Sequence, residues 1–199
     1  MKSLLIETLS FNVSPITLTE GKSISGNPLV EGILATVEIK NGNGRYYSKE
    51  LWDREIDKYN VLVKERRACG ELDHPDSQVI NLKNVSHNIS KIWWNGDNVM
   101  GSIELLPTPS GNILKALIES GIKVGVSSRG MGSLKQVGEV LEVQDDFELL
   151  CWDFVSTPSN PGSYMSPLHE GLNPQIDLYS KVNSIVTEIL CSNGTCPIF

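Results

Sequence analysis

Short apolar segments rich in β-branched residues recur along this chain, and clusters of Gly, Pro, Asn, Asp and Ser separate them. This pattern is typical of β-strands bounded by turns, and it predicts a protein built mostly from sheets. The predicted strands cover residues 3–12, 29–40, 84–95, 97–106, 124–128, 137–143 and 147–157. Apolar residues at helical spacing predict helices over residues 48–67, 109–121 and 174–191.

The predicted helices do not alternate regularly with the strands. A doubly wound parallel sheet requires that alternation, so it is disfavoured. We therefore predict an α+β fold, in which a partly closed mixed or antiparallel β-barrel carries a few surrounding helices.

The charge of the chain excludes some partners. The net charge is −7 and the isoelectric point about 5.0, whereas non-specific nucleic-acid binding requires a basic surface. No apolar run is long enough to span a bilayer, and Glu7 interrupts the apolar start that a signal peptide would need. We therefore expect a cytoplasmic protein that binds neither nucleic acid nor membrane and whose four cysteines are reduced.

The stretch GVSSRGMGSL, residues 125–134, concentrates serine and glycine. It lacks the Gly-Lys-Ser/Thr of a phosphate-binding loop, and Arg129 stands where a nucleophile elbow would have its second glycine. Ser127 is the candidate nucleophile at the end of a strand. Ser128, Arg129 and Gly130 are predicted to form an oxyanion or substrate loop, because glycines let backbone N–H groups converge. The alternative is a solvated strand-to-loop turn.

A serine nucleophile needs a base, usually a histidine that an acid orients. The chain has three histidines, of which His74 lies in GELDHP, and Asp153 lies in the otherwise apolar CWDFV. An acid in such a strand is paired or points into a cleft, so Asp153 orients a histidine or forms an ion pair with a lysine or arginine. A zinc site of Cys69, His74 and His87 is a rival, but no closely spaced ligand pair supports it.

Four blocks occur in one order: GELDHP, SHNISKIWWNGDNVMG, SGIKVGVSSRGMGSL and WDFVSTPSNPG. They resemble the prohead (procapsid maturation) serine proteases of tailed phages, of the T-even prohead core protease type, which are related to the herpesvirus assemblins. The resemblance covers roughly residues 3–165. It implies an assemblin-like β-barrel with surrounding helices. It also implies a serine endopeptidase that works through an acyl-enzyme and needs no cofactor and no metal.

The family's catalytic residues fall on particular positions of this chain. The resemblance implies that Ser127 is the nucleophile, His74 the base and Asp153 the third member of a triad. In the herpesvirus relatives the third member is a second histidine, and His87 is the substitute if that arrangement holds.

The resemblance also implies a biological role. It places a prohead protease domain over residues 1–171 and a C-terminal tail, helical and removable, over residues 172–199. Such proteases act inside the assembling prohead in the host cytoplasm. They cleave scaffolding or core proteins, the major capsid precursor and themselves, and we expect self-association. A preference for cleavage after Glu in a Leu/Ile-x-Glu context suggests autocleavage after Glu170. The alternative is a catalytically silent scaffold or capsid-assembly protein that retains the fold.

Overall fold

The computed structural model describes residues 2–6, 23, 25–75, 77–156, 163 and 165–167. Two helices are present in these residues, α1 (Lys49–Lys64) and α2 (Pro109–Glu119). The strands are β1 (Ser3–Ile6), β2 (Leu29–Thr36), β3 (Arg45–Tyr46), β4 (Cys69–Glu71), β5 (Val85–Asn95), β6 (Asn98–Leu105), β7 (Gly125–Gly132), β8 (Leu134–Val137), β9 (Val140–Val143), β10 (Glu148–Val155) and β11 (Ser166–Pro167).

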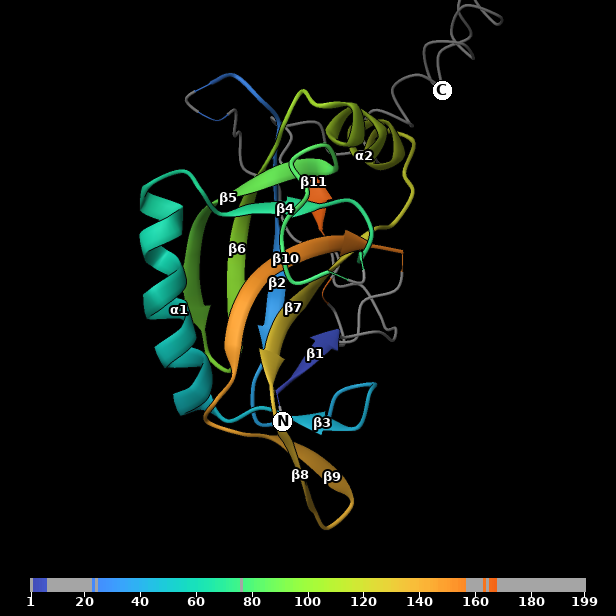
Figure 1. The fold of residues 1–199 in the computed structure, drawn as a ribbon. Helices are drawn as coiled ribbons and strands as arrows, with labels where there is room; N and C mark the ends of the chain where they lie inside the picture. The colour runs from blue at the N-terminus through green and yellow to red at the C-terminus, as the bar shows by residue number, and fades with distance from the viewer. Residues whose placement is uncertain are drawn as a thin grey trace, which may run out of the picture.

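The strands form three sheets. A five-stranded sheet has the order β11-β2-β6-β5-β4, and a three-stranded sheet has the order β1-β7-β10. The third sheet, β3-β9-β8, includes a β8–β9 hairpin that projects from the end of the molecule, as Figure 1 shows. All pairings are antiparallel except β3 with β9. The predicted α+β class is confirmed. The described strands do not join into a closed barrel, so the partly closed barrel and the likeness to assemblins stay predictions.

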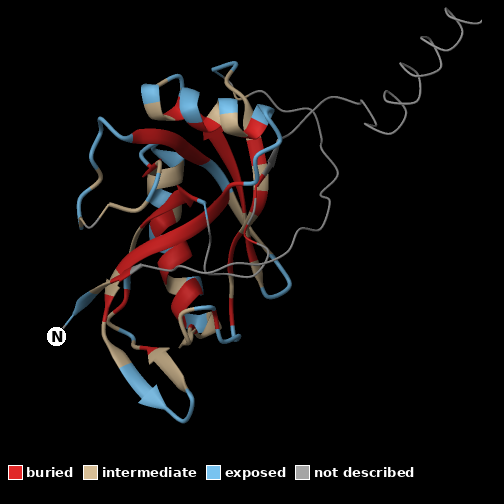
Figure 2. Ribbon diagram, turned by 90° about the vertical axis from the view of Figure 1, so that its right-hand side faces the viewer, coloured by how far each residue is buried: buried red, intermediate tan, exposed pale blue. Residues whose placement is uncertain are grey.

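The helix α1 packs its apolar side against the sheets. Ser48 caps its first turn by accepting a hydrogen bond from the amide of Leu51 at 3.2 Å. The ring of Trp52 stacks on Trp152 of β10 with centroids 5.7 Å apart, and Tyr59 meets Trp152 edge-on at 4.9 Å. These aromatic contacts hold β10 beneath the helix, and Figure 2 shows the buried middle of the molecule in red.

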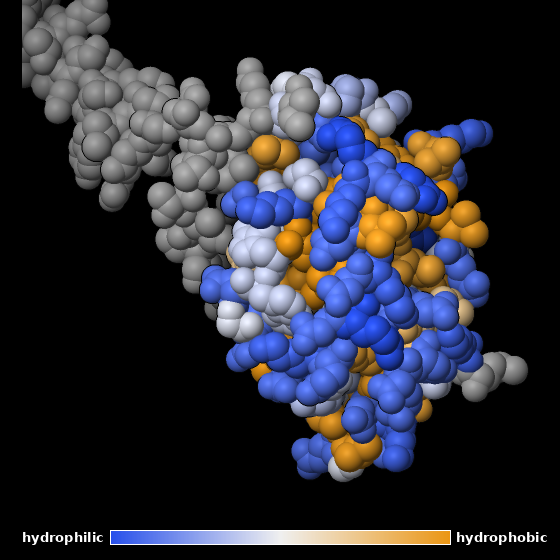
Figure 3. All heavy atoms as spheres, turned by 90° about the vertical axis from the view of Figure 1, so that its left-hand side faces the viewer, coloured by the Kyte–Doolittle hydropathy of each residue, from blue (hydrophilic) through white to orange (hydrophobic). Residues whose placement is uncertain are grey.

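The opposite side of α1 faces outward. Figure 3 shows this face as largely hydrophilic, with hydrophobic residues gathered between the charged side chains. Within the described residues, no helix is both long and apolar enough to cross a membrane. The predicted helix over residues 174–191 and the tail over residues 172–199 lie outside the described residues.

The strand β4 lies outside the predicted strands. The sequence around GELDHP is short and polar, yet β4 pairs with β5 there and adds an edge strand to the large sheet. This strand has only three residues, which is too short for a periodic pattern to reveal. Its position matters because the chain leaves β4 directly toward β10.

Candidate active site

The pairing of β7 with β10 places two of the predicted site residues face to face. Ser127 is the direct register partner of Asp153, and Arg129 is the partner of Cys151. Directly opposite residues of an antiparallel pair point to the same side of the sheet. Ser127 and Asp153 therefore share one face of the sheet. Ser128, whose partner is Trp152, belongs to the opposite face, which packs on the core.

The segment after β4 brings His74 to the same face. A β-carbon on Gly70 would lie 2.0 Å from the carbonyl oxygen of Trp152, so only glycine lets β4 approach β10 this closely. The chain then docks on β10, because the amide of Asp73 donates to the carbonyl of Phe154 at 2.8 Å. Asp73 has a left-handed backbone with φ 69°, a conformation that Asp tolerates better than most residues. This turn delivers His74 to Asp153.

The imidazole of His74 contacts the Asp153 carboxylate. His74 Nδ1 lies 2.8 Å from Asp153 Oδ2, and the Asp153 side chain is fully buried. Asp153 Oδ1 also accepts a hydrogen bond from the backbone amide of Glu71 at 2.9 Å. Burial raises the pKa of Asp153, but the hydrogen bonds from His74 and Glu71 and the charge of Arg129 outweigh it, so the pKa lies below its usual value. Asp153 is therefore an anion at neutral pH.

An anionic acceptor fixes the tautomer of the histidine. Because the Asp153 carboxylate accepts at Nδ1, the neutral His74 ring carries its proton there and leaves a lone pair on Nε2. Nε2 is buried and has no hydrogen-bond partner among the described residues. Ser127 and His74 both adjoin Asp153, so the structure brings the three predicted catalytic residues together on one side of the β7–β10 pair.

The prediction of a loop at residues 128–130 is wrong. The strand β7 runs without interruption from Gly125 to Gly132 and pairs with β10 and β1. The glycines that suggested a turn serve packing, since a β-carbon on Gly130 would lie 2.5 Å from the ring of Phe147. Any contact of Ser128, Arg129 or Gly130 with a substrate stays a prediction.

Arg129 occupies the buried centre of the site. Its Nε donates to Asp153 Oδ2 at 2.9 Å and its Nη2 donates to Glu71 Oε2 at 2.8 Å. Its Nη1 donates to the carbonyl oxygen of Ser77 at 2.7 Å. Asp153 thus makes both contacts that the sequence left open, one with a histidine and one with an arginine. Glu71 was not predicted as a site residue, because β4 is too short for the sequence to reveal that this acid is buried.

His87 has a different environment from His74. Its Nδ1 lies 2.8 Å from the hydroxyl of Ser86, its Nε2 lies 3.0 Å from the carbonyl oxygen of Trp152, and its ring meets Phe154 edge-on. Burial lowers the pKa of His87 to about 4, despite the nearby Asp153 and the bond to Trp152. His87 is therefore a neutral core residue, and Asp153 rather than His87 contacts His74.

The rival zinc ligands do not come together. Cys69 Sγ lies 3.9 Å from Asn88 Oδ1, and both ring nitrogens of His87 have the partners given above. In the part of the chain that the structure describes, no group of three or more His, Cys, Asp or Glu residues is placed to hold a metal ion. His169 lies outside the described residues.

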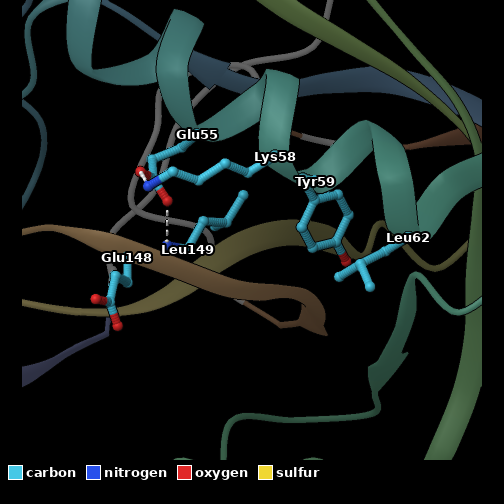
Figure 4. A pocket seen from close by; sticks show the side chains of 6 residues that line it. All are labelled: Glu55, Lys58, Tyr59, Leu62, Glu148 and Leu149. Carbon is cyan, nitrogen blue, oxygen red and sulfur yellow. Dashed lines mark hydrogen bonds and ion pairs between the residues drawn. The ribbon is translucent and has the colours of Figure 1, made fainter.

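A hollow of about 260 Å³ lies between α1 and the start of β10, away from these residues. Figure 4 shows the residues that line it: Glu55, Lys58, Tyr59, Leu62, Glu148 and Leu149. Its polar groups are already engaged, because the buried Glu55 carboxylate accepts from Lys58 at 2.8 Å and from the amide of Leu149 at 2.9 Å. These bonds fix α1 to β10, and the hollow contributes no group to the proposed catalytic cluster.

Comparisons with known proteins place the chain in a family. Residues 6–172 match the sequence model of the family described as prohead core protein serine protease. The prohead core protein protease of Enterobacteria phage T4 is 33% identical over 155 residues, which cover 74% of this chain and 73% of that protein. The solved structure of the bacteriophage T4 capsid assembly protease superposes with a TM-score of 0.69 at 31% identity, covering 77% of this chain and 98% of the other.

Proposed function

The chain belongs to the family of prohead core protein serine proteases, and we propose that Ser127, His74 and Asp153 are its catalytic triad. The contact between His74 Nδ1 and Asp153 Oδ2 at 2.8 Å, directly across the strand pair from Ser127, carries this proposal. It is a base held by an acid beside a serine, which is the arrangement that serine hydrolysis requires.

In the proposed mechanism, each of the three residues has its own step. Ser127 Oγ attacks the scissile carbonyl while His74 Nε2 takes its proton, and Asp153 stabilises the imidazolium that forms. His74 then donates that proton to the leaving amine, which departs and leaves an acyl-enzyme on Ser127. A water molecule, deprotonated by His74, attacks the ester, and the proton returns to Ser127 as the new carboxyl end departs.

The substrates follow from the family. We propose that this protease cleaves the core or scaffolding proteins and the major capsid precursor inside the assembling prohead, and that it cleaves itself. The protease domain is assigned to residues 1–171. Autocleavage after Glu170 and removal of the tail stay proposals, because these residues lie outside the described part of the chain. Self-association and an assemblin-like ancestry are likewise proposed from the family resemblance.

The site is closed in this conformation. Ser127 and Asp153 are fully buried, and the His74 side chain is only 7% exposed. One edge of β7 near Ser127 pairs with β10, and on the other edge the amide of Val126 donates to the carbonyl of Ser163 at 2.8 Å. Access of a peptide to Ser127 therefore requires a local opening, which is a conformational step before chemistry.

The test compares the wild type with Ser127→Ala and with Ser128→Ala as the matched control. Each protein is incubated with the purified scaffolding protein of the same phage, and fragment masses are followed over hours. We expect fragments from the wild type and from Ser128→Ala, and none from Ser127→Ala. Cleavage by Ser127→Ala at the wild-type rate would overturn the assignment. A wild type that cleaves nothing, even in assembled proheads, would favour a silent assembly protein.

A further inference from the structure

The guanidinium of Arg129 is buried among the proposed catalytic residues and does not face an open surface. Its side chain is 1% exposed, and it is paired with two acids, Glu71 and Asp153, that are 0% exposed. Burying such charges is costly, and an ion pair replaced by apolar residues is often no less stable. Fold stability alone is therefore a weak reason for three buried charges beside a catalytic histidine.

We propose that Glu71 and Arg129 are positioning residues of the active site, whose ion pair holds both the Asp153 carboxylate and the segment that carries His74. This inference rests on the proposed triad. It differs from the predicted role of Arg129 in a substrate loop, because it assigns Arg129 to the catalytic acid. It also gives Glu71 a role that the triad alone does not.

The ion pair fixes the plane of the Asp153 carboxylate. Arg129 Nε holds Oδ2 at 2.9 Å on the same oxygen that contacts His74, and Arg129 Nη2 lies 3.3 Å from Oδ1. The amide of Glu71 holds Oδ1 at 2.9 Å. With both oxygens bound, the carboxylate cannot rotate away from His74 without breaking a charge-assisted hydrogen bond.

The same pair ties the chain that follows His74. Arg129 Nη1 donates to the carbonyl of Ser77 at 2.7 Å, and Glu71 Oε1 accepts from the amide of Asn81 at 2.6 Å. The segment is thus held at two backbone points after the histidine, in addition to the docking of Asp73 on β10 before it. Both anchor points depend on the ion pair, so loosening it would release His74 from Asp153.

Charge balance explains why a second acid is present. Arg129 beside Asp153 would by itself cancel the negative charge that stabilises the His74 imidazolium. Glu71 restores it, so that Glu71, Arg129 and Asp153 together carry a charge of −1. When His74 takes the proton of Ser127, the four groups become neutral as a set. A low-dielectric site favours the state in which buried charges sum to zero.

Other titratable groups around Asp153 stay uncharged near neutral pH. Burial raises the pKa of the Cys151 thiol well above its usual value, and Asp153 raises it further. Burial likewise raises the pKa of Tyr59, which approaches from α1, and lowers that of His87, on β5, to about 4. Among the described residues, the buried charges beside His74 and Asp153 are therefore those of Glu71 and Arg129, while the acid of Asp73, directly before His74 in the chain, is exposed to solvent.

The test is the pH dependence of kcat/KM for cleavage of the scaffolding protein by folded variants. Glu71→Gln removes a negative charge. We therefore expect the acid limb of the profile, where kcat/KM falls toward low pH, to move to lower pH by about half a unit or more. We also expect kcat to fall about tenfold or more, with little change in KM. Arg129→Met removes a positive charge, and the acid limb should move to higher pH. Arg129→Lys keeps the positive charge but loses the planar guanidinium that binds several acceptors at once. It should therefore lower kcat and leave the acid limb in place.

Glu104→Gln is the matched control. Glu104 is a fully buried acid in β6 that accepts from Arg66 at 2.7 Å and from Ser23 at 2.7 Å, in the five-stranded sheet. This control should lower stability and leave the acid limb unchanged. If Arg129→Met does not fold, Glu71→Gln against Glu104→Gln decides alone. A Glu71→Gln profile that superposes on the control, while Ser127→Ala is inactive, would overturn only this inference. Activity in Ser127→Ala would instead overturn the proposed triad.

Discussion

Replacing Asp153 by Asn removes a charge from the site while keeping the shape of the side chain. Asp153 Oδ2 accepts from His74 and from Arg129 Nε, at 2.8 and 2.9 Å, and Oδ1 accepts from the amide of Glu71 at 2.9 Å. An Asn side chain has one oxygen and one NH₂ group, and the NH₂ group only donates. In either orientation, that group therefore faces a donor of Arg129 or Glu71.

Both orientations damage catalysis. If the NH₂ group faces His74, the ring accepts at Nδ1 and carries its proton on Nε2, where the base must be free. If the oxygen faces His74, the tautomer is kept, but the imidazolium loses its neighbouring anion. The corresponding change in serine protease triads lowers kcat about 10⁴-fold, so we expect a loss of about 10³- to 10⁴-fold, or roughly 4–5.5 kcal/mol in the barrier.

The substitution also removes one of the two acids that pair with Arg129. Breaking a buried ion pair in this way costs about 3–5 kcal/mol of stability, of which Glu71 retains a part. The assay must therefore separate lost chemistry from lost fold. We would measure kcat with scaffolding protein and the free energy of unfolding in urea for the same preparations, with Asp145→Asn, an exposed acid, as the control. A folded Asp153→Asn enzyme with kcat within tenfold of the wild type would refute the reasoning.

Two further predictions concern stability. Burial raises the pKa of Glu55, but bonds from Lys58, the Leu149 amide and Arg54 outweigh it, so its pKa lies below 4.5. A depressed pKa gives stability above pH 4.5 that is lost as pH falls through the folded value. Glu55→Gln should thus cost about 1–3 kcal/mol at pH 7 in urea titrations and progressively less below pH 4.5; an equal cost at both pH values would contradict this. Because Asp73 has φ 69°, Asp73→Val should lower the free energy of unfolding by about 1–2 kcal/mol in the same titrations, while Asp73→Asn should be nearly neutral. Equal effects of the two substitutions would exclude backbone strain as the cause.

The sequence predicted the elements with clear periodicity. The apolar spacing in residues 48–67 predicted α1, and the β-branched segments over residues 84–95 and 97–106 predicted β5 and β6. The glycines of β7 predicted a loop that is absent from residues 128–130, because Gly is common both in turns and where an aromatic ring packs on a strand. Only the structure shows that the ring of Phe147 occupies that space.

The site was predicted less completely than the helices. Asp153 stood out because an acid in an apolar strand needs a partner, whereas the roles of Ser127 and His74 were implied by the family resemblance. Their partners depend on strand register, which places Arg129 two residues from Ser127 on the same face and so beside Asp153. Without the strand register, the sequence gives no reason to pair Arg129 with Asp153 and Glu71 rather than with a substrate.

The proposed catalytic cluster lies where two sheets meet, and this position determines how its activity can be lost. Glu71 lies in the edge strand of the five-stranded sheet and His74 follows it in the chain, whereas Ser127, Arg129 and Asp153 belong to the β1-β7-β10 sheet. Among the described residues, the backbone joins the end of β4 to β10 through the bridge between Leu72 and Phe154 and the adjacent hydrogen bond from Asp73. Each sheet keeps its own ladder if that junction opens, but the base then leaves the nucleophile. In the proposed mechanism, opening this junction would therefore abolish activity without unfolding either sheet, and the buried ion pair of Glu71 with Arg129 is one side-chain contact that spans it.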